Sequence, residues 1–427
     1  ASPGTVRGLH WTASCDHSVT LSQWPFWANE LKAMGIGWVK LLDNGNGSSE
    51  QLVRALRSID VIPVVRLYRP RPNPGHLQAL ATSVPQAPAP ITLQNLSTVS
   101  RLVIAGAQYF ETTNEPNLRD EWDYGGWMSL NWQQRVHAVM ENWLIDAQNV
   151  MLRGGLPGFP ALAPSAHTLT DSAIGSIRFY IEAVKYLAEA HPNQAMDAFH
   201  NGAWLAVHNY GWNHPPSYPY DPINQKDHPG ETTRSDDCCI RAYEVIRDLI
   251  KETFGATPPI ICTEGGYVPP PNGWQQLDSR YDPLTYDSQA RLTVAMFTWL
   301  RENAPEVWGC CPWLVANERL GHTDKQWSQS VWYTESGELP VVKAMKEAVV
   351  TQPPEFVPLA AIREAAWNAA GVPFNPDAAF PRFAKSHSLG VPMTAEFDVN
   401  GYRAQGYAGG IVYCKIPNWS EVKWSEW

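Results

Sequence analysis

The chain has 427 residues, of which 44% are hydrophobic and 17% charged, so it can bury a large core and is too apolar for a disordered chain. Its 32 Lys and Arg stand against 42 Asp and Glu, which gives a net charge of −10 and disfavours nucleic acid and anionic membrane as partners. No run of 18 apolar residues predicts a membrane span, and neutral polymers stay open as partners.

The chain begins ASPGTVRG, without the basic and apolar stretches of a secretory signal. We therefore expect either a mature exported chain or one made without a signal. The seven Cys include the vicinal pairs 238–239 and 310–311 but form no dense framework, so disulfides are not expected to organise the fold.

Eight short apolar or β-branched segments recur, each followed by a helix-like stretch. The segments are 7–13 (RGLHWTA), 37–44 (GWVKLLDN), 61–69 (VIPVVRLYR), 109–114 (YFETTN), 160–166 (PALAPSA), 204–210 (WLAVHNY), 259–264 (PIICTE) and 307–315 (VWGCCPWLV). Helical periodicity marks 21–34, 50–59, 132–152, 177–190, 240–254, 289–303 and 341–350. This alternation predicts an α/β fold in which residues 1–350 form a (β/α)8 TIM barrel, with a doubly wound sheet as the alternative.

Long loops rich in aromatic residues follow the fourth, sixth, seventh and eighth predicted strands. They carry Trp122, Tyr124 and Trp127, then Trp212, Tyr218 and Tyr220, then Trp274, Tyr281 and Tyr286, then Trp327 and Trp332. In a TIM barrel these loops surround the carboxyl ends of the strands, where active sites lie. Of the 20 Trp and 16 Tyr, we expect about half to fill the core and half to line a site, because flat rings stack on sugars.

A Pro-rich segment at 351–358 (TQPPEFVP) predicts a linker to a small C-terminal α+β appendage at 359–427. We expect helices at 359–370 and 376–386, then short strands and turns over 390–416. The run 389–413, LGVPMTAEFDVNGYRAQGYAGGIVY, resembles a single LGFP-type repeat of bacterial cell-surface and cell-wall proteins. That resemblance implies wall or surface association; the alternative is a packing domain braced against the barrel.

Two isolated glutamates end predicted strands. Glu115 lies in ETTNEPN, where Pro116 stops the fourth strand, and Glu264 ends the apolar run PIIC of the seventh. The fourth and seventh strands lie on opposite sides of an eight-stranded barrel, so the two side chains can face each other across its mouth. Two facing carboxylates suit glycosidic hydrolysis, in which one donates a proton and the other stays ionised.

Asn-Glu-Pro ending strand 4 and Thr-Glu-Gly ending strand 7 resemble the clan A glycoside hydrolases, a likeness that spans residues 7 to about 350. It implies a retaining hydrolase of β-glycosidic bonds with Glu115 as acid/base and Glu264 as nucleophile. It also implies that Asn114 binds the sugar 2-hydroxyl and that Trp313 forms the floor of the subsite that holds the cleaved sugar. His208 and Tyr210 correspond to clan residues that touch the substrate or hold the nucleophile.

Further candidates come from polar and aromatic residues inside the strand segments and the fourth loop. Lys40 and Arg66 are cations within apolar runs and need carboxylate partners. Glu111 lies four residues before Glu115, on the same side of the strand, and is the expected ion-pair partner of Arg66 or Lys40. The remaining substrate-binding candidates are His10, Trp11 and Trp122.

No metal site and no cofactor are predicted. Cys238 and Cys239 with Asp236 and Asp237 lack the spaced second pair of a zinc site, and no glycine-rich nucleotide motif precedes a helix. The aromatic loops favour endo-action on a polysaccharide or oligosaccharide, and export is expected from such a substrate. Two alternatives stay open: a catalytically silent glycan-binding barrel, and a Lys40-based aldolase.

Overall fold

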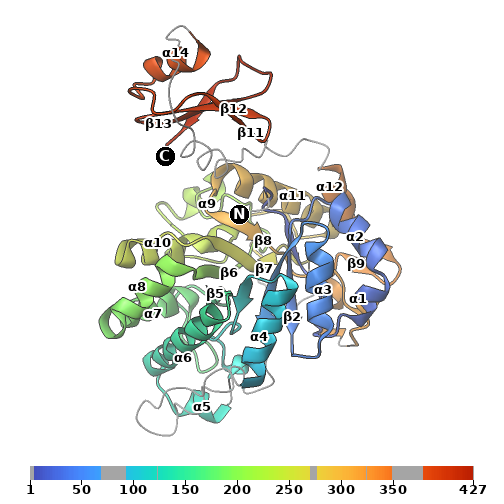
Figure 1. The fold of residues 1–427 in the computed structure, drawn as a ribbon. Coiled ribbons are helices and arrows are strands. Elements are labelled where there is room, and N and C mark those ends of the chain that lie inside the picture. The colour runs from blue at the N-terminus through green and yellow to red at the C-terminus, as the bar shows by residue number, and fades with distance from the viewer. Residues whose placement is uncertain are drawn as a thin grey trace. The chain divides into compact units, whose positions relative to one another are not determined.

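The computed structural model describes residues 4–68, 93–122, 124–269, 277–323, 325–348 and 378–426. The chain divides into two compact units, Ala1–Gln352 and Pro353–Trp427 (Figure 1). The predicted linker at 351–358 and the predicted helix at 359–370 lie outside the described residues.

The first unit is the predicted (β/α)8 barrel. Its strands are β1 (Gly8–His10), β2 (Trp38–Asp43), β3 (Ile62–Leu67), β4 (Tyr109–Glu111), β5 (Leu156–Phe159), β6 (Trp204–Tyr210), β7 (Ile260–Gly266) and β8 (Val307–Cys310). They follow one another in chain order, each parallel to the next. A parallel bridge between Arg7 and Cys310 links the last strand to the first, which closes the barrel.

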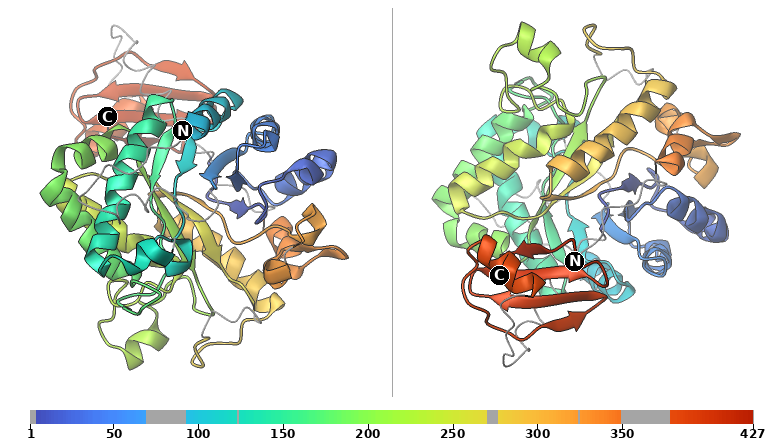
Figure 2. Two further views of the ribbon diagram at one scale, coloured as in Figure 1. Left: turned by 90° about the horizontal axis from the view of Figure 1, so that it is seen from below. Right: turned by 90° about the horizontal axis from the view of Figure 1, so that it is seen from above.

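Helices surround the strands, as Figure 2 shows. They are α1 (Ser18–Ser22), α2 (Trp24–Ala33), α3 (Ser48–Arg57), α4 (Leu93–Ala105), α5 (Tyr124–Met128), α6 (Trp132–Leu152), α7 (Ser176–Ala190), α8 (Pro192–Asn201), α9 (Pro222–Asp227), α10 (Tyr243–Phe254), α11 (Tyr286–Asn303) and α12 (Pro340–Glu347). Local signals set their ends: Asn131 and Gln134 form a reciprocal capping box at the start of α6, and Gly255 ends α10 in a left-handed conformation. None of the described helices is both long and apolar enough to cross a membrane.

The fifth strand differs from the prediction. It is formed by Leu156–Phe159 (LPGF), before the predicted segment 160–166. Proline and glycine disfavour a strand, so the sequence pattern hides this one, and the neighbouring β4 and β6 hold it in place. The predicted segment instead runs on as loop, and its Ala161 carbonyl accepts the backbone N–H of Glu115 at 3.0 Å.

The barrel interior changes from apolar to polar along each strand. Trp38, Val64, Tyr109, Ala206 and Ile261 form one buried apolar cluster across five strands. Two residues further along, on the same face of each strand, the side chains are Lys40, Arg66, Glu111, His208 and Thr263. The apolar layer therefore fills the barrel interior, and a layer of polar and charged groups lies next to it, nearer the carboxyl ends of these strands.

The second unit contains α14 (Ala379–Ser386) and a four-stranded antiparallel sheet in the order β11-β12-β13-β14. Its strands are β11 (Phe397–Val399), β12 (Tyr402–Tyr407), β13 (Gly410–Lys415) and β14 (Lys423–Ser425). Phe380, Ala384 and Leu389 pack against Tyr407 and Val412 of the sheet. This unit is α+β, as the sequence predicts.

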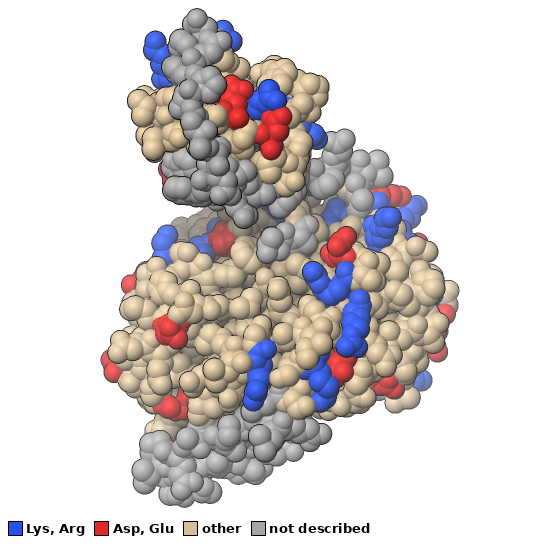
Figure 3. Space-filling model, viewed as in Figure 1, with Lys and Arg blue, Asp and Glu red and all other residues tan. Residues whose placement is uncertain are grey.

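Charges are sparse on the barrel face that Figure 3 displays. Lys and Arg gather there over α3 and α4, where α3 carries Arg54 and Arg57 in its last turn, and the rest of this face is mostly uncharged (Figure 3).

Candidate active site

Glu264 lies near the end of β7, in a network of donors and cations. The Tyr210 hydroxyl donates to its Oε1 at 2.5 Å, while His208 Nε2 and Lys40 Nζ lie 3.7 and 3.8 Å from its Oε2. Burial by itself raises the pKa of this carboxyl, but His208, Lys40, the Tyr210 hydroxyl and Arg66 together outweigh burial and hold the pKa below its usual value. The site therefore keeps Glu264 ionised.

The backbone around Glu264 explains the two glycines that follow it. Gly265 has a φ of +143°, and a Cβ there would lie 2.5 Å from Asn209 Oδ1. Gly266 has a φ of +78°, and a Cβ there would lie 2.8 Å from Pro312. Only glycine fits both positions, so the Gly-Gly pair lets the end of β7 lie close to Asn209 and Pro312.

Glu115 lies on the loop after β4, with a backbone φ of +40°. Its Oε1 is 2.7 Å from His208 Nδ1, and its side chain is 15% exposed. His208 thus stands between the two glutamates, one ring nitrogen directed to each.

The two carboxyl groups lie close to each other across the mouth. One oxygen of Glu115, one nitrogen of His208 and one oxygen of Glu264 all lie within 4.8 Å of one another. Retaining glycosidases hold their two carboxyl groups about 5–5.5 Å apart, whereas inverting enzymes leave about 6.5–9.5 Å for a water molecule. One oxygen of each carboxyl within 4.8 Å of the other is compatible with the shorter, retaining spacing.

Comparison with known proteins reveals similarity in structure only. No family model matches the sequence, and no curated protein matches it. Among solved structures, a family 39 glycoside hydrolase from Bacteroides cellulosilyticus aligns with a TM-score of 0.50 at 10% identity, over 97% of this chain and 72% of that one. That likeness shows the fold.

Two further solved structures align less well. A family 51 α-L-arabinofuranosidase from Bifidobacterium longum has a TM-score of 0.45 at 10% identity, over 82% of this chain and 73% of that one. A fungal β-1,4-galactanase has a TM-score of 0.45 at 12% identity, over 80% of this chain and 98% of that one.

Lys40 is the cation that pairs with Glu111. Its Nζ lies 2.9 Å from Glu111 Oε2, and the Thr263 hydroxyl donates to Glu111 Oε1 at 2.7 Å. The sequence leaves Arg66 or Lys40 open as the partner. Within the described residues, no carboxylate lies in ion-pairing distance of Arg66, which is 8% exposed and is one of the charges acting on Glu264.

A β-bulge in β7 directs both Thr263 and Glu264 into the barrel interior. Val207 pairs with Cys262 and His208 pairs with Glu264, so Thr263 is the extra residue on β7. Alternation normally sends consecutive side chains to opposite faces of a strand. At this bulge, consecutive residues both reach the interior: Thr263 contacts Glu111, and Glu264 faces His208 and Lys40.

Trp313 and His10 line the same mouth. Their rings meet edge to face, with centroids 4.3 Å apart, and both residues are buried. Burial, with Lys40 and Arg66 nearby, lowers the pKa of His10 well below its usual value, so this ring is neutral. Half-buried Trp212 and Trp327 pack against the cluster that contains Tyr210 and Trp313.

Two predicted substrate-binding residues are not brought to the mouth. Trp11 follows His10 and so points to the opposite side of the strand, where it packs on Trp27 and donates its indole N–H to Thr20 Oγ1 at 2.8 Å. Trp122 is 3% exposed and donates its indole N–H to the Pro116 carbonyl at 2.8 Å. Trp11 is therefore a core residue, and Trp122 binds the loop that carries Glu115.

The aromatic loops divide between core and mouth. Trp127 and Trp332 are at most 1% exposed and belong to the main hydrophobic core, although they lie in loops predicted to form the cleft. Trp274 lies outside the described residues. Among the loop tryptophans described, Trp212 and Trp327 are the ones that lie half-buried beside the mouth cluster.

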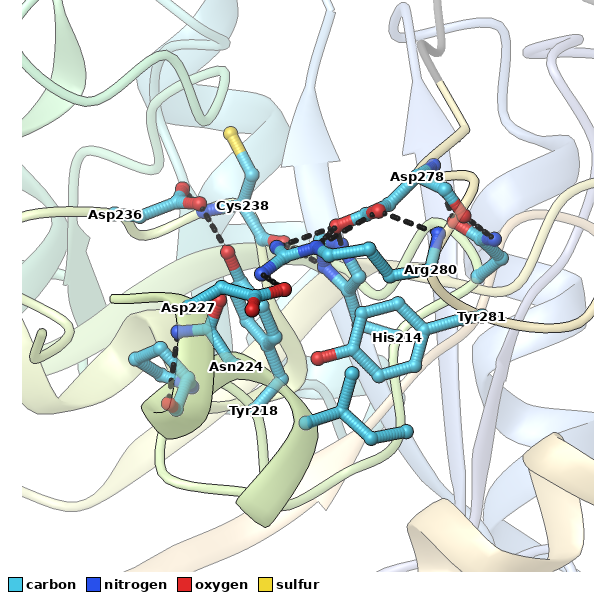
Figure 4. A network of polar contacts seen from close by, with 12 residues as sticks. His214, Tyr218, Asn224, Asp227, Asp236, Cys238, Asp278, Arg280 and Tyr281 are labelled. Atoms are coloured by element: carbon cyan, nitrogen blue, oxygen red, sulfur yellow. Dashed lines mark hydrogen bonds and ion pairs between the residues drawn. The ribbon is translucent and has the colours of Figure 1, made fainter. Parts of the chain in front are cut away.

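A polar network, drawn in Figure 4, ties the loop after β6 to the loop after β7. His214 stacks on Tyr218 with centroids 3.7 Å apart, and its Nε2 lies 3.4 Å from Asp278 of the other loop. Arg280 donates to both oxygens of Asp278 and holds the pKa of that carboxyl down to about 2. Because Trp212 lies two residues before His214, this network fixes the loop that presents Trp212.

One mouth residue was missed by the sequence analysis. Glu121, in a short 3-10 helix at Arg119–Glu121, accepts a hydrogen bond from Asn114 Nδ2 at 3.0 Å. Burial first, and then the nearby Glu115 and Glu264, raise the pKa of its carboxyl. No periodic pattern marks Glu121, and the one available signal is a carboxylate six residues after Glu115 in the same loop.

Among the described residues, two groups have ligand atoms close enough to hold a metal ion. One is Glu115, His208 and Glu264; the other is Asp236, Asp237 and Cys238. In the second group, Asp237 already accepts hydrogen bonds from Ala166 N and Ser176 Oγ, so its oxygens serve the structure. In the first group, the contacts described above suit proton transfer and nucleophilic attack.

Proposed function

We propose that the barrel is a retaining glycoside hydrolase in which Glu264 is the nucleophile and Glu115 the acid/base. One observation carries the proposal: carboxylate oxygens of Glu115 and Glu264 lie within 4.8 Å of each other at the carboxyl ends of β4 and β7. The polar environment of Glu264, which keeps that carboxyl ionised, supports the division of roles. The fold shared with a family 39 glycoside hydrolase is consistent with this chemistry.

The proposed reaction has two steps. Glu264 attacks the anomeric carbon while Glu115 gives its proton to the departing glycosidic oxygen, which forms a covalent glycosyl-enzyme. Glu115 then takes a proton from water, the water oxygen bonds to the anomeric carbon, and the Glu264 ester breaks. Oε1 of Glu264 is held by Tyr210, so Oε2, whose neighbours are 3.7 and 3.8 Å away, is left for the attack.

The stereochemistry of the product tests this proposal. We expect the first-formed sugar to keep the β-configuration of the substrate. NMR spectra recorded during the reaction, before the product mutarotates, measure that configuration. An α-configured first product would exclude Glu264 as nucleophile. Binding of polysaccharides without any turnover would identify the barrel as a glycan-binding protein instead.

We further propose endo-action on a β-linked polysaccharide or oligosaccharide. Trp212 and Trp327 flank the mouth cluster that contains Trp313, which supports several adjoining sugar subsites. A series of β-linked oligosaccharides of increasing length tests this: kcat/KM should rise with length, and cleavage should be internal. Release of single sugars from one end would show exo-action.

For the second unit we propose a role in cell-wall or surface association of an exported protein. The support is the resemblance of 389–413 to an LGFP-type repeat, together with Trp419 and Trp424, which are 44% and 37% exposed. The full chain should co-sediment with isolated bacterial cell walls, and a Trp419→Ala/Trp424→Ala variant should do so less. Equal sedimentation of both proteins would contradict a role for these two side chains.

A further inference from the structure

The segment 114–122 forms a compact unit with a polar side chain at each end. Leu118 N donates to the Glu115 carbonyl at 2.9 Å, and Glu121 N donates to the Leu118 carbonyl at 3.2 Å, so two consecutive turns bring Glu121 back toward Asn114. The indole of Trp122 then donates to the Pro116 carbonyl. These contacts fix the position of Glu121 relative to Asn114 and Glu115.

The rest of the barrel anchors this segment at its middle. Asn117 is fully buried, and its amide donates to the carbonyls of Ala163 and Ile174 and accepts from Ala163 N, all at 3.0 Å. Arg119 N donates to the Ser172 carbonyl at 2.8 Å. The loop is therefore held from both sides, which makes the Asn114–Glu121 contact a fixed feature of the mouth.

The contact also determines how the Asn114 amide is oriented. A carboxylate oxygen only accepts hydrogen bonds, so the NH2 group of Asn114 must point to Glu121. Asn114 Oδ1 then lies elsewhere, buried and without a hydrogen-bond partner among the described residues. One N–H and one carbonyl oxygen of this amide are left for a ligand, in a direction that Glu121 sets.

The surroundings of Glu121 place it beside the reacting groups. The charges that act on its carboxyl include Arg66, Glu115 and Glu264, and burial is the largest influence on its pKa, which is raised. Glu121 is thus within electrostatic reach of Glu115 and Glu264, and it accepts a hydrogen bond from Asn114.

We propose that Glu121 is a positioning residue that locks the Asn114 amide for recognition of the 2-hydroxyl of the cleaved sugar. This inference rests on the proposed glycosidase function and deepens it. The 2-hydroxyl as the ligand of Asn114 is what the resemblance to clan A implies; the new element is that Glu121 holds the orientation of that amide. A hydrogen bond of this kind, lost from the transition state, corresponds to about a tenfold change in kcat/KM.

The test compares an aryl β-glycoside with its 2-deoxy analogue. The Glu121→Met variant keeps the length of the side chain and removes the acceptor; the preference for the 2-hydroxyl substrate should fall about tenfold. Glu121→Gln should retain most of the preference, because its carbonyl oxygen accepts the same N–H. Adding Asn114→Ala to Glu121→Met should lower the preference no further, since the two residues act as one unit.

Glu231 provides a matched control. Asn224 Nδ2 donates to Glu231 Oε2 at 2.7 Å across the same seven-residue spacing, in the loop after β6. Glu231→Met should leave the preference unchanged. An equal loss on both substrates in Glu121→Met, or an unchanged preference, would overturn the inference, and melting temperatures of Glu121→Met and Glu121→Gln would separate such a result from unfolding. Absence of hydrolysis by the wild-type chain would remove the proposed function and this inference with it.

Discussion

Glu264 and Glu115 face each other across one mouth, yet the barrel holds them differently. Three side chains surround the carboxylate of Glu264: Tyr210 donates to it, and Lys40 and His208 lie within 4 Å. Among the described residues, the carboxylate of Glu115 contacts His208. Their side chains are similarly exposed, at 11% and 15%, so the difference lies in the partners and not in burial.

This difference fits the opposite roles that we propose for two identical residues. Cations and a hydroxyl donor stabilise the ionised form of Glu264, as a nucleophile needs. Among the described residues, the carboxylate of Glu115 has one hydrogen-bonding neighbour, His208, and we propose that it exchanges a proton with the substrate. The predictions below test this asymmetry, from the largest expected effect to the smallest.

Removing either glutamate should abolish most activity while the fold persists. Glu264→Ala and Glu115→Ala should each lower kcat/KM by several orders of magnitude, because each takes away a group that reacts. Added azide distinguishes the roles: it should give an α-glycosyl azide with Glu264→Ala and a β-glycosyl azide with Glu115→Ala. The same azide product from both variants would contradict the proposed difference in role between Glu264 and Glu115.

Replacing Lys40 should affect both stability and the pH profile. Lys40→Met leaves Glu111 buried without its cation, which should cost about 3–5 kcal/mol of unfolding free energy, measured with urea. Lys40 also lowers the pKa of Glu264, so its loss raises that pKa and moves the acid limb of kcat/KM to higher pH. An acid limb that stays in place would show that Lys40 serves only Glu111.

Removing the Tyr210 hydroxyl should weaken the nucleophile without disturbing the core. Tyr210→Phe deletes one hydrogen bond to a charged oxygen, worth about 1.5–3 kcal/mol, so kcat should fall roughly 10- to 100-fold. The acid limb should again move to higher pH, since the hydroxyl lowers the pKa of Glu264. A change in KM alone would make Tyr210 a substrate contact instead.

The smallest effect is expected on the Glu115 side. Trp122→Phe keeps an aromatic ring and removes the indole N–H that binds the Pro116 carbonyl, which should cost about 1 kcal/mol of stability and a few-fold in kcat. Trp11→Phe removes a similar bond, to Thr20, in the core and serves as the control. It should lower the melting temperature and leave kcat unchanged; a loss of kcat as large as that of Trp122→Phe would contradict this distinction.

The sequence predicts the barrel because hydrophobic periodicity is strong in its helices and most strands. The prediction fails at β5, where Pro157 and Gly158 conceal a strand that its neighbours impose. The sequence also places Glu115 and Glu264 near the carboxyl ends of the fourth and seventh strands, but it misplaces the ends themselves: β4 stops at Glu111, and β7 continues through Gly266.

The finer parts of the mouth depend on information that a single sequence does not carry. The bulge at Thr263 sets two consecutive side chains inside the barrel, against the alternation on which sequence reasoning relies. The choice of Lys40 over Arg66 as the partner of Glu111 depends on distances between strands. Glu121 reaches Asn114 through the two turns of its loop, and no sequence pattern predicts these turns.

The left-handed backbone of Glu115 has a consequence for how this barrel could change over time. A non-glycine residue in that conformation costs of the order of 1–3 kcal/mol. Glycine at position 115 would relieve this cost, so selection or engineering for heat resistance alone would favour a barrel that has lost its proposed proton donor. Under the proposed function, stability and turnover therefore compete at residue 115.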